Sequence, residues 1–359
     1  MSTRSKRNAS SSKSKKLNSK RGRVNPLLSI SEDNEGLIEN AEPVLKAVKE
    51  TIYTGPDPNL NNAPYIQTHD FREPPPPELV KGRGSSKTVW HIPGSEGTGT
   101  RVIVNATEEQ HQIREKARDD YNYTKLLHDT YGCFSEVAEI PHLVGKKFEK
   151  FVYFAEIAQR VTFRTALEGD FYLRHAFRLF NTLYSAPGEH FMVLIDIKPD
   201  NFGIIDHGNG PTLICIDIDT KDIIAVPKRL ETKTKFFMKY QQLLLLMTFF
   251  LFTNCPQKAQ LFKTFADFYG LTKYDFYRVC NYVFSKEDVT ELTTYHQRFL
   301  HSHGLSHSAK DIERSVRVGY YRPPPFHLRY YLRDNYQVIV DLLSGESIAA
   351  NYDHPNFLF

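Results

Sequence analysis

Apolar positions along the chain divide residues 79–345 into a strand-rich part and a helix-rich part. In the first part, short apolar runs predict strands within 79–90, 101–106 and 140–158. A long polar segment with apolar residues on one side, at 107–128, predicts a single helix among them. In the second part, apolar residues recur at helical spacing, which predicts helices at 170–184, 236–252, 257–268, 274–284 and 330–343.

The middle of the chain predicts an antiparallel hairpin with polar side chains at its open end. Residues 202–216 contain two apolar runs separated by Asp-His-Gly-Asn-Gly, which is typical of a turn. Such a hairpin brings Asn201, before the first strand, close to Asp217, after the second. With Asp196 and Lys198 nearby, these groups can hold Mg²⁺ and a triphosphate beside a catalytic carboxylate. The alternative is a buried hairpin flanked by solvated charges.

Charge separates the N-terminal tail from the rest of the chain. Residues 1–24 contain nine Lys or Arg and no acidic residue. Because the 359-residue chain carries +4 in total, the remainder carries −5, which argues against a basic nucleic-acid-binding domain. The tail is predicted to be disordered. It is a candidate nuclear-import signal or a contact to nucleic acid or an acidic partner, and the alternative is a solubilising tail.

Composition also characterises the segments that flank the predicted domain. Residues 25–78 form a Pro- and Asn-rich extension, and 346–359 form an aromatic C-terminal tail. The four cysteines are widely spaced, which is typical of reduced thiols in an intracellular protein of the nucleus or cytoplasm. The longest apolar run, 243–252, is shorter than the ~20 residues that span a bilayer, so we expect a buried helix and no membrane span. The histidine-containing segment 296–307 predicts a polar surface loop, with a Zn²⁺ site on His301, His303 and His307 as the less favoured alternative.

The Asp-Ile-Lys-Pro-Asp-Asn sequence at 196–201 resembles the catalytic loop of protein kinases. The resemblance covers roughly residues 79–255. It implies an α+β, two-lobed protein-kinase-like fold, with a small antiparallel β lobe and one helix at 79–158 and a larger helical lobe at 159–345. It also implies ATP and Mg²⁺ as cofactors.

The resemblance assigns a role to each polar residue of this region. Asp196 would orient the acceptor hydroxyl, and Lys198 would neutralise the transferring phosphoryl group. Asn201 and Asp217 would hold Mg²⁺, with Asp219 as the second candidate for the latter position. The usual Asp-Phe-Gly sequence is Asp-Ile-Asp here.

A second resemblance concerns the nucleotide phosphates. Protein kinases carry a phosphate-binding lysine on the third strand, where this chain has Asn105. The glycine-rich segment with Gly82 and Gly84 resembles that of the with-no-lysine kinases, in which a lysine on the second strand replaces the missing one. This predicts that Lys87 binds the phosphates, because neighbouring strands lie about 4.8 Å apart. The alternative for Lys87 is a solvated strand lysine.

The remaining nucleotide contacts follow from the same resemblance. An acid on the predicted helix 107–128 would orient the lysine; Asp120 fits the spacing best, with Glu115 as the alternative. The end of the predicted strand pair, around Glu156 and Ala158, falls at the hinge position that offers backbone hydrogen bonds to adenine.

The chain also departs from the family. Leu194 and Ile195 replace the usual His-Arg, and that arginine ordinarily binds a phosphorylated activation loop, so we expect no control by such a phosphate. Residues 220–235 are short and basic and lack Ala-Pro-Glu, so the groove for a peptide substrate is largely missing. Three functions remain open. They are a divergent Ser/Thr protein kinase-like phosphotransferase with an unidentified protein substrate, a pseudokinase that works as a binding or assembly module through its basic tail, and a kinase-fold enzyme acting on a small molecule.

Overall fold

The computed structural model describes the part of the chain that contains most of the predicted elements. The described residues are 77–83, 87–90, 100–105, 111–139, 152–156, 158–206, 210–281, 286–305, 312–313 and 326–344. All of them belong to one unit of the chain, Pro43–Phe359. The predictions for the basic tail, for most of the extension 25–78 and for the tail 346–359 lie outside the described residues.

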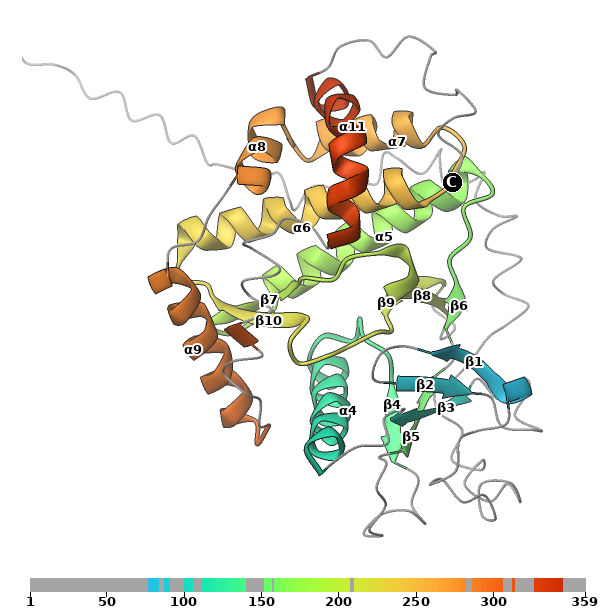
Figure 1. Ribbon diagram of the computed structural model, residues 1–359, viewed down its shortest axis with the longest axis vertical. Helices are drawn as coiled ribbons and strands as arrows, with labels where there is room; N and C mark the ends of the chain where they lie inside the picture. The colour runs from blue at the N-terminus through green and yellow to red at the C-terminus, as the bar shows by residue number, and fades with distance from the viewer. Residues whose placement is uncertain are drawn as a thin grey trace, which may run out of the picture. The chain divides into compact units, whose positions relative to one another are not determined.

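A five-stranded antiparallel sheet is built from the strand-rich part of the sequence (Figure 1). Its strands lie in the order β1-β2-β3-β5-β4, and one helix, α4, connects β3 to β4. The two strands within 79–90 and the third strand are confirmed, while residues 84–86 between the first two lie outside the described residues. Strand β5 lies within the predicted range 140–158, whereas β4 ends at Glu139, before that range begins. The elements are β1 (Val80–Arg83), β2 (Lys87–Trp90), β3 (Thr100–Asn105), α4 (His111–Tyr131), β4 (Val137–Glu139) and β5 (Val152–Glu156).

Helix α4 joins this sheet to the rest of the described chain because two of its faces are apolar. Tyr121 packs with Tyr153 and Ala155 of the sheet. Tyr123 and Leu127, both fully buried, belong instead to the large core formed mainly by the later elements. The residues of α4 therefore connect the two parts through packing as well as through the chain.

Two smaller antiparallel sheets lie in the later part of the chain. One has the order β6-β8-β9, and its β8–β9 pair is the predicted hairpin. The other pairs β7 with β10, a strand of five buried residues that the sequence analysis did not predict. The bounds are β6 (Gln159–Arg160), β7 (His190–Leu194), β8 (Phe202–Ile205), β9 (Thr212–Cys215) and β10 (Ile223–Pro227).

Helices form most of the remaining described structure (Figure 1). The predicted buried helix is confirmed as part of α6: residues 243–250 of the run 243–252 are buried, while Leu251 is half-buried and Phe252 is exposed. Among the described residues, none of the helices has both the length and the apolar character required to cross a membrane. The helices are α5 (Ala166–Ser185), α6 (Glu231–Phe252), α7 (Lys258–Phe268), α8 (Lys273–Asn281), α9 (Lys286–Ser302) and α11 (Phe326–Ser344).

Helix α5 begins four residues earlier than the apolar spacing predicted, and a capping box explains why. The Oγ1 of Thr165 accepts a hydrogen bond from the backbone N–H of Glu168 at 3.2 Å. The Glu168 carboxylate in turn accepts from the backbone N–H of Thr165 at 2.9 Å. These bonds satisfy backbone donors that have no partner within the first turn, so they set the start of the helix.

The prediction of a polar surface loop at 296–307 is wrong for its first seven residues, which continue α9 to Ser302. His296 is fully buried within this helix. The pattern that indicates the helix lies upstream, because Val289, Leu292, His296 and Leu300 follow helical spacing and are all buried. The loop prediction failed because it rested on the polar residues alone and did not include the apolar positions upstream.

Candidate functional site

The loop that carries Asp196 joins β7 to β8 through a 3-10 helix, η6 (Pro199–Asn201). Ile195 and Ile197 are buried on either side of Asp196 and anchor the loop in the core. Asp196 and Lys198 keep 30% and 37% of their side chains exposed, so the anchored loop leaves these two charged groups accessible.

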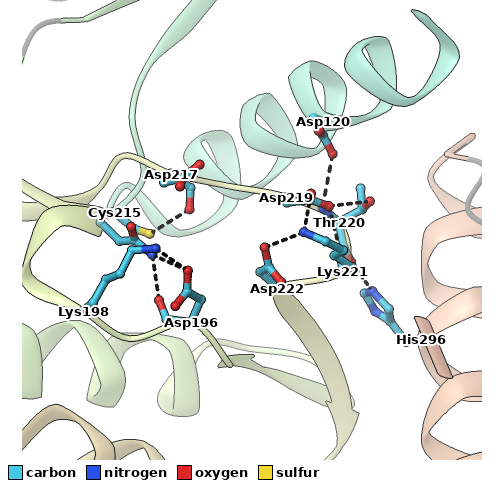
Figure 2. Close-up of polar contacts among 11 residues, drawn as sticks. Asp120, Asp196, Lys198, Cys215, Asp217, Asp219, Thr220, Lys221, Asp222 and His296 are labelled. Carbon is cyan, nitrogen blue, oxygen red and sulfur yellow. Dashed lines mark hydrogen bonds and ion pairs between the residues drawn. The ribbon is translucent and has the colours of Figure 1, made fainter. Parts of the chain in front are cut away.

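Asp196, Lys198 and Asn201 form one hydrogen-bonded group, of which Figure 2 labels Asp196 and Lys198. The Nζ of Lys198 donates to Oδ2 of Asp196 at 2.8 Å. The Nδ2 of Asn201 donates to the main-chain oxygen of Asp196 at 2.8 Å and to its Oδ2 at 3.1 Å. The Asp196 carboxylate is therefore held by two donors from its own loop.

Charge keeps Lys198 protonated at this position. Burial acts to lower the pKa of Lys198, but the hydrogen bond and charge of Asp196, with the charges of Asp217 and Asp222, outweigh burial and raise it. Since an ammonium group next to a reacting phosphate can offset developing negative charge, this protonation state suits phosphoryl transfer.

The hairpin places Asn201 and Asp217 at the same end, as the sequence predicted. Phe202 of β8 pairs with Cys215 of β9. One step further, the backbone N–H of Ile216 donates to the main-chain oxygen of Asn201 at 2.9 Å. Asp217 follows directly, and its main-chain oxygen lies 3.8 Å from the Sγ of Cys215.

Asp217, the favoured candidate, and Asp219, the second, have different surroundings in the structure. Asp217 is an exposed residue. Asp219 is buried at 6% exposure, and its carboxylate accepts from the Nζ of Lys221 at 2.7 Å and from the backbone N–H of Lys221 at 3.0 Å. Asp217 is therefore the carboxylate that remains accessible to a cation, and Asp219 fixes the shape of the segment.

Lys221 links two carboxylates and was not singled out from the sequence (Figure 2). Its Nζ contacts Asp219 and also Oδ2 of Asp222 at 2.8 Å. Burial raises the pKa of Asp222 to about 6, and the charge of Asp219 adds to this, while Lys221 opposes it. The density of charge in Asp-Ile-Asp-Thr-Lys-Asp, residues 217–222, is the sequence signal that could have identified this ion cluster.

The backbone of Thr220 is held by two helices. The Oδ1 of Asp120, on α4, accepts from the N–H of Thr220 at 3.3 Å, and Asp120 is 1% exposed. The Nε2 of His296, on α9, lies 2.8 Å from the main-chain oxygen of Thr220. The residue predicted to orient the nucleotide lysine thus contacts the segment after Asp217, whereas the side chain of its alternative, Glu115, lies outside the described residues.

The glycine-rich segment forms strands β1 and β2, and the pairing of their backbones places its residues. Lys87 in β2 pairs directly with Asn105 in β3. Gly82 lies in β1, where the pairing register shifts between Val80 and Gly82. Gly84 lies outside the described residues, as does the side chain of Lys87.

The two predicted hinge residues follow one another closely. Glu156 ends β5 opposite Thr100, and its side chain lies outside the described residues. Ala158 comes directly before β6, and a Cβ built on Gly203 would lie 2.3 Å from the Cβ of Ala158. Ala158 therefore packs against the strand that follows the Asp196 loop.

Comparisons with known proteins add no assignment to this geometry. No protein-family model matches the chain, and no curated protein matches it.

The donor set suits a cation that is also bound by phosphate oxygens. Within the described ranges, no group of three or more His, Cys, Asp or Glu side chains could hold a metal ion. Mg²⁺ at nucleotide sites commonly takes one or two protein oxygen ligands together with phosphates and water. Asn201 is buried and its amide nitrogen bonds Asp196, which leaves the amide oxygen as its potential ligand atom. One such oxygen together with the exposed Asp217 matches a nucleotide-bound Mg²⁺ better than an independent metal site.

Proposed function

We propose that the chain is an ATP- and Mg²⁺-dependent phosphotransferase of the protein-kinase-like type. The observation that carries the proposal is the hydrogen-bonded group of Asp196, Lys198 and Asn201, next to Asp217 at the open end of a hairpin. A carboxylate, an ammonium group and two oxygen ligands are the groups that phosphoryl transfer requires from a protein.

The order of the elements supports the same proposal. A two-lobed kinase-like fold requires one antiparallel sheet with a single helix, followed by a mainly helical part. The sheet β1-β2-β3-β5-β4 with α4 between β3 and β4, and the helices from α5 onward, agree with that requirement.

The strand register supports a phosphate-binding role for Lys87. Lys87 and Asn105 are directly opposite each other in an antiparallel pair, where Cα atoms lie roughly 4.5–5.5 Å apart. A flexible lysine can deliver its charge across such a distance. The relocation of the ammonium group from position 105 to position 87 therefore requires no rearrangement of the sheet.

Each group then has a part in transfer. Asp196, fixed by Lys198 and Asn201, accepts a hydrogen bond from the acceptor hydroxyl and orients its oxygen toward the γ-phosphate. Lys198 offsets the negative charge that develops on the transferring group. Asn201 and Asp217 would hold Mg²⁺, which supplies neutralisation of the phosphate charge when bound.

Radiolabelled phosphate transfer from ATP tests this function. We expect the wild type to incorporate label in the presence of Mg²⁺, and Asp196→Asn to lower the rate by about 100-fold or more, because a positioned acid–base group contributes about that factor. Asp200→Asn is the matched control, since Asp200 lies in the same loop but forms an exposed ion pair with Arg160 at 2.7 Å. It should keep the wild-type rate.

Two outcomes would contradict the proposal. Wild-type protein that labels no protein, lipid, small molecule or itself would favour a pseudokinase that binds or assembles partners, and the basic tail would then be the first segment to examine. Equal rates for Asp196→Asn and Asp200→Asn would exclude Asp196 from the chemistry.

One observation favours a small-molecule acceptor as the second candidate. Lys228, Arg229 and Leu230 alone join β10 to α6. This connection leaves little chain to form the platform on which protein kinases bind a peptide. Running the same assay with protein, lipid and small hydroxyl acceptors in separate arms distinguishes the two kinds of substrate.

A further inference from the structure

Strand β10 is supported along both edges. One edge pairs with β7. Ile223 and Ala225 are two residues apart, so their backbone groups point to the same side, away from β7. On that side, the Oη of Tyr123 from α4 donates to the oxygen of Ile223 at 2.9 Å, and the N–H of Ala225 donates to Nδ1 of His296 from α9 at 3.1 Å.

His296 connects β10 to the segment that follows Asp217 (Figure 2). Because its Nδ1 accepts from Ala225, its Nε2 carries the proton and donates to the main-chain oxygen of Thr220 at 2.8 Å. The ring is fully buried and lies edge-on to Tyr123, with 6.3 Å between the ring centroids. One imidazole therefore holds two backbone groups five residues apart.

The Thr220 backbone receives a second support from the opposite direction. Its N–H bonds Asp120 of α4, while its oxygen bonds His296 of α9. Within the segment, Lys221 links Asp219 to Asp222. The chain between Asp217 and β10 is thus fixed by two helices and an internal ion cluster.

This segment also offers no accessible hydroxyl for phosphorylation. Between Asp217 and the first residue of α6, Thr220 is the only Ser, Thr or Tyr in the sequence. Its exposed fraction is 0%. A phosphate added within the segment therefore cannot be what orders it.

We propose that His296 is a positioning residue that holds the Asp217 segment from helix α9, so that the site is ordered without phosphorylation of that segment. This inference rests on the proposed phosphotransfer. The buried imidazole fixes the position of the segment through hydrogen bonds to its backbone, whereas a phosphorylated loop would be fixed through the charge of the phosphate.

Two substitutions at 296 separate the hydrogen bonds from the packing. His296→Phe keeps an aromatic ring and removes both bonds, whereas His296→Gln supplies an amide oxygen for Ala225 and an amide N–H for Thr220. Leu292→Ala, one turn away on α9 and also fully buried, is the matched control for general loosening of the helix. Each full-length variant is assayed for kcat, for KM of ATP, for thermal unfolding and for amide hydrogen exchange.

In His296→Phe we expect the amide hydrogen of Ala225 to exchange at least about tenfold faster than in the wild type. We also expect kcat to fall by about tenfold, which equals about 1.4 kcal/mol of transition-state stabilisation. His296→Gln should restore both quantities to within about threefold of wild type. Leu292→Ala should lower the unfolding temperature while kcat, measured well below that temperature, stays near the wild-type value.

Each alternative result decides against a specific part of the inference. Unchanged Ala225 exchange in His296→Phe overturns the support of the segment, whatever the activity. Faster exchange with unchanged kcat overturns the positioning role, and a Gln variant as impaired as Phe overturns the hydrogen-bond explanation. Absence of transfer by the wild type overturns the proposed function and the link to turnover, while a protected Ala225 amide in the same sample would still support the structural contact.

Discussion

Gly203 in β8 is a position where the structure leaves no room for a side chain. A Cβ at this position would lie 2.3 Å from the Cβ of Ala158, 3.3 Å from Cγ2 of Ile216 and 3.4 Å from the main-chain oxygen of Gln159. Carbon atoms in contact lie about 3.5–4.0 Å apart, so the first contact is too short by roughly 1.2–1.7 Å. No side-chain rotation can relieve it, because both carbons are attached directly to the backbone.

The substitution Gly203→Ala must therefore move the chain at Ala158 away from β8, which pairs with β6 through Arg160 and Gly203. We expect the free energy of unfolding to fall by about 1–3 kcal/mol, the usual cost of overpacking. A glycine-to-alanine change in a strand would otherwise stabilise it by roughly 0.5–1 kcal/mol, so a loss has to come from the clash. Urea denaturation followed by circular dichroism measures the change.

A second substitution tests the cause. Ala158→Gly removes the methyl group that the new Cβ would meet, so the double variant Ala158→Gly/Gly203→Ala should recover most of the lost stability. Recovery should be incomplete, because the contacts with Ile216 and Gln159 remain. The reasoning would be refuted by a Gly203→Ala protein as stable as wild type, or by a double variant no more stable than the single one. Gly210→Ala is the control. An added Cβ there meets nothing within 4 Å, and its cost comes only from the positive φ of 92°, which Ala158→Gly should not relieve.

Two further predictions concern the nucleotide site and helix α5. Mg-ATP at about 100 times its dissociation constant should stabilise the wild type by about 2.7 kcal/mol. Lys87→Ala should lose most of the resulting thermal shift, whereas Asn105→Ala should keep it. The reverse result would exclude the relocated lysine. For Glu168, burial acts to raise the pKa, but hydrogen bonds from Thr162, Thr165 and Arg164 outweigh it and lower the pKa. The carboxylate therefore contributes stability above its ordinary pKa of about 4.3, and this contribution is lost as pH falls through the lowered folded-state pKa. Glu168→Gln keeps one of the two accepting oxygens, so it should cost roughly 0.5–1.5 kcal/mol at pH 7 and less below pH 4. Glu287→Gln, an exposed first-turn change in α9, should show neither effect in urea titrations at each pH.

Local patterns in the sequence predicted the elements whose apolar spacing is regular. The hairpin of β8 and β9, the buried helix α6 and the third strand were confirmed because strong apolar runs coincide with turn residues at their ends. Residue Asp217 was favoured over Asp219 from its place after the strand, and the observed exposure agrees.

Elements with weaker local signals were missed. Strand β10 is a short apolar run, Ile-Ile-Ala-Val at 223–226, inside the basic segment 220–235, and its partner edge is β7, 29 positions earlier between the paired residues Ile223 and Leu194. The helical pattern of α9 is local, but the role of His296 on its buried side is not, since the imidazole bonds backbone groups of Thr220 and Ala225. Neither partner is visible within a local window.

The sequence by itself determined the local arrangement of the 196–201 loop, because Lys198 and Asn201 both bond Asp196 within six residues. It also determined that Asn201 and Asp217 meet, since a hairpin needs only two apolar runs and a turn. The tertiary structure alone decided what holds the next segment in place. Asp120 and His296 reach Thr220 across 100 and 76 positions of the chain, and contacts at such separation depend on how helices pack rather than on any local pattern.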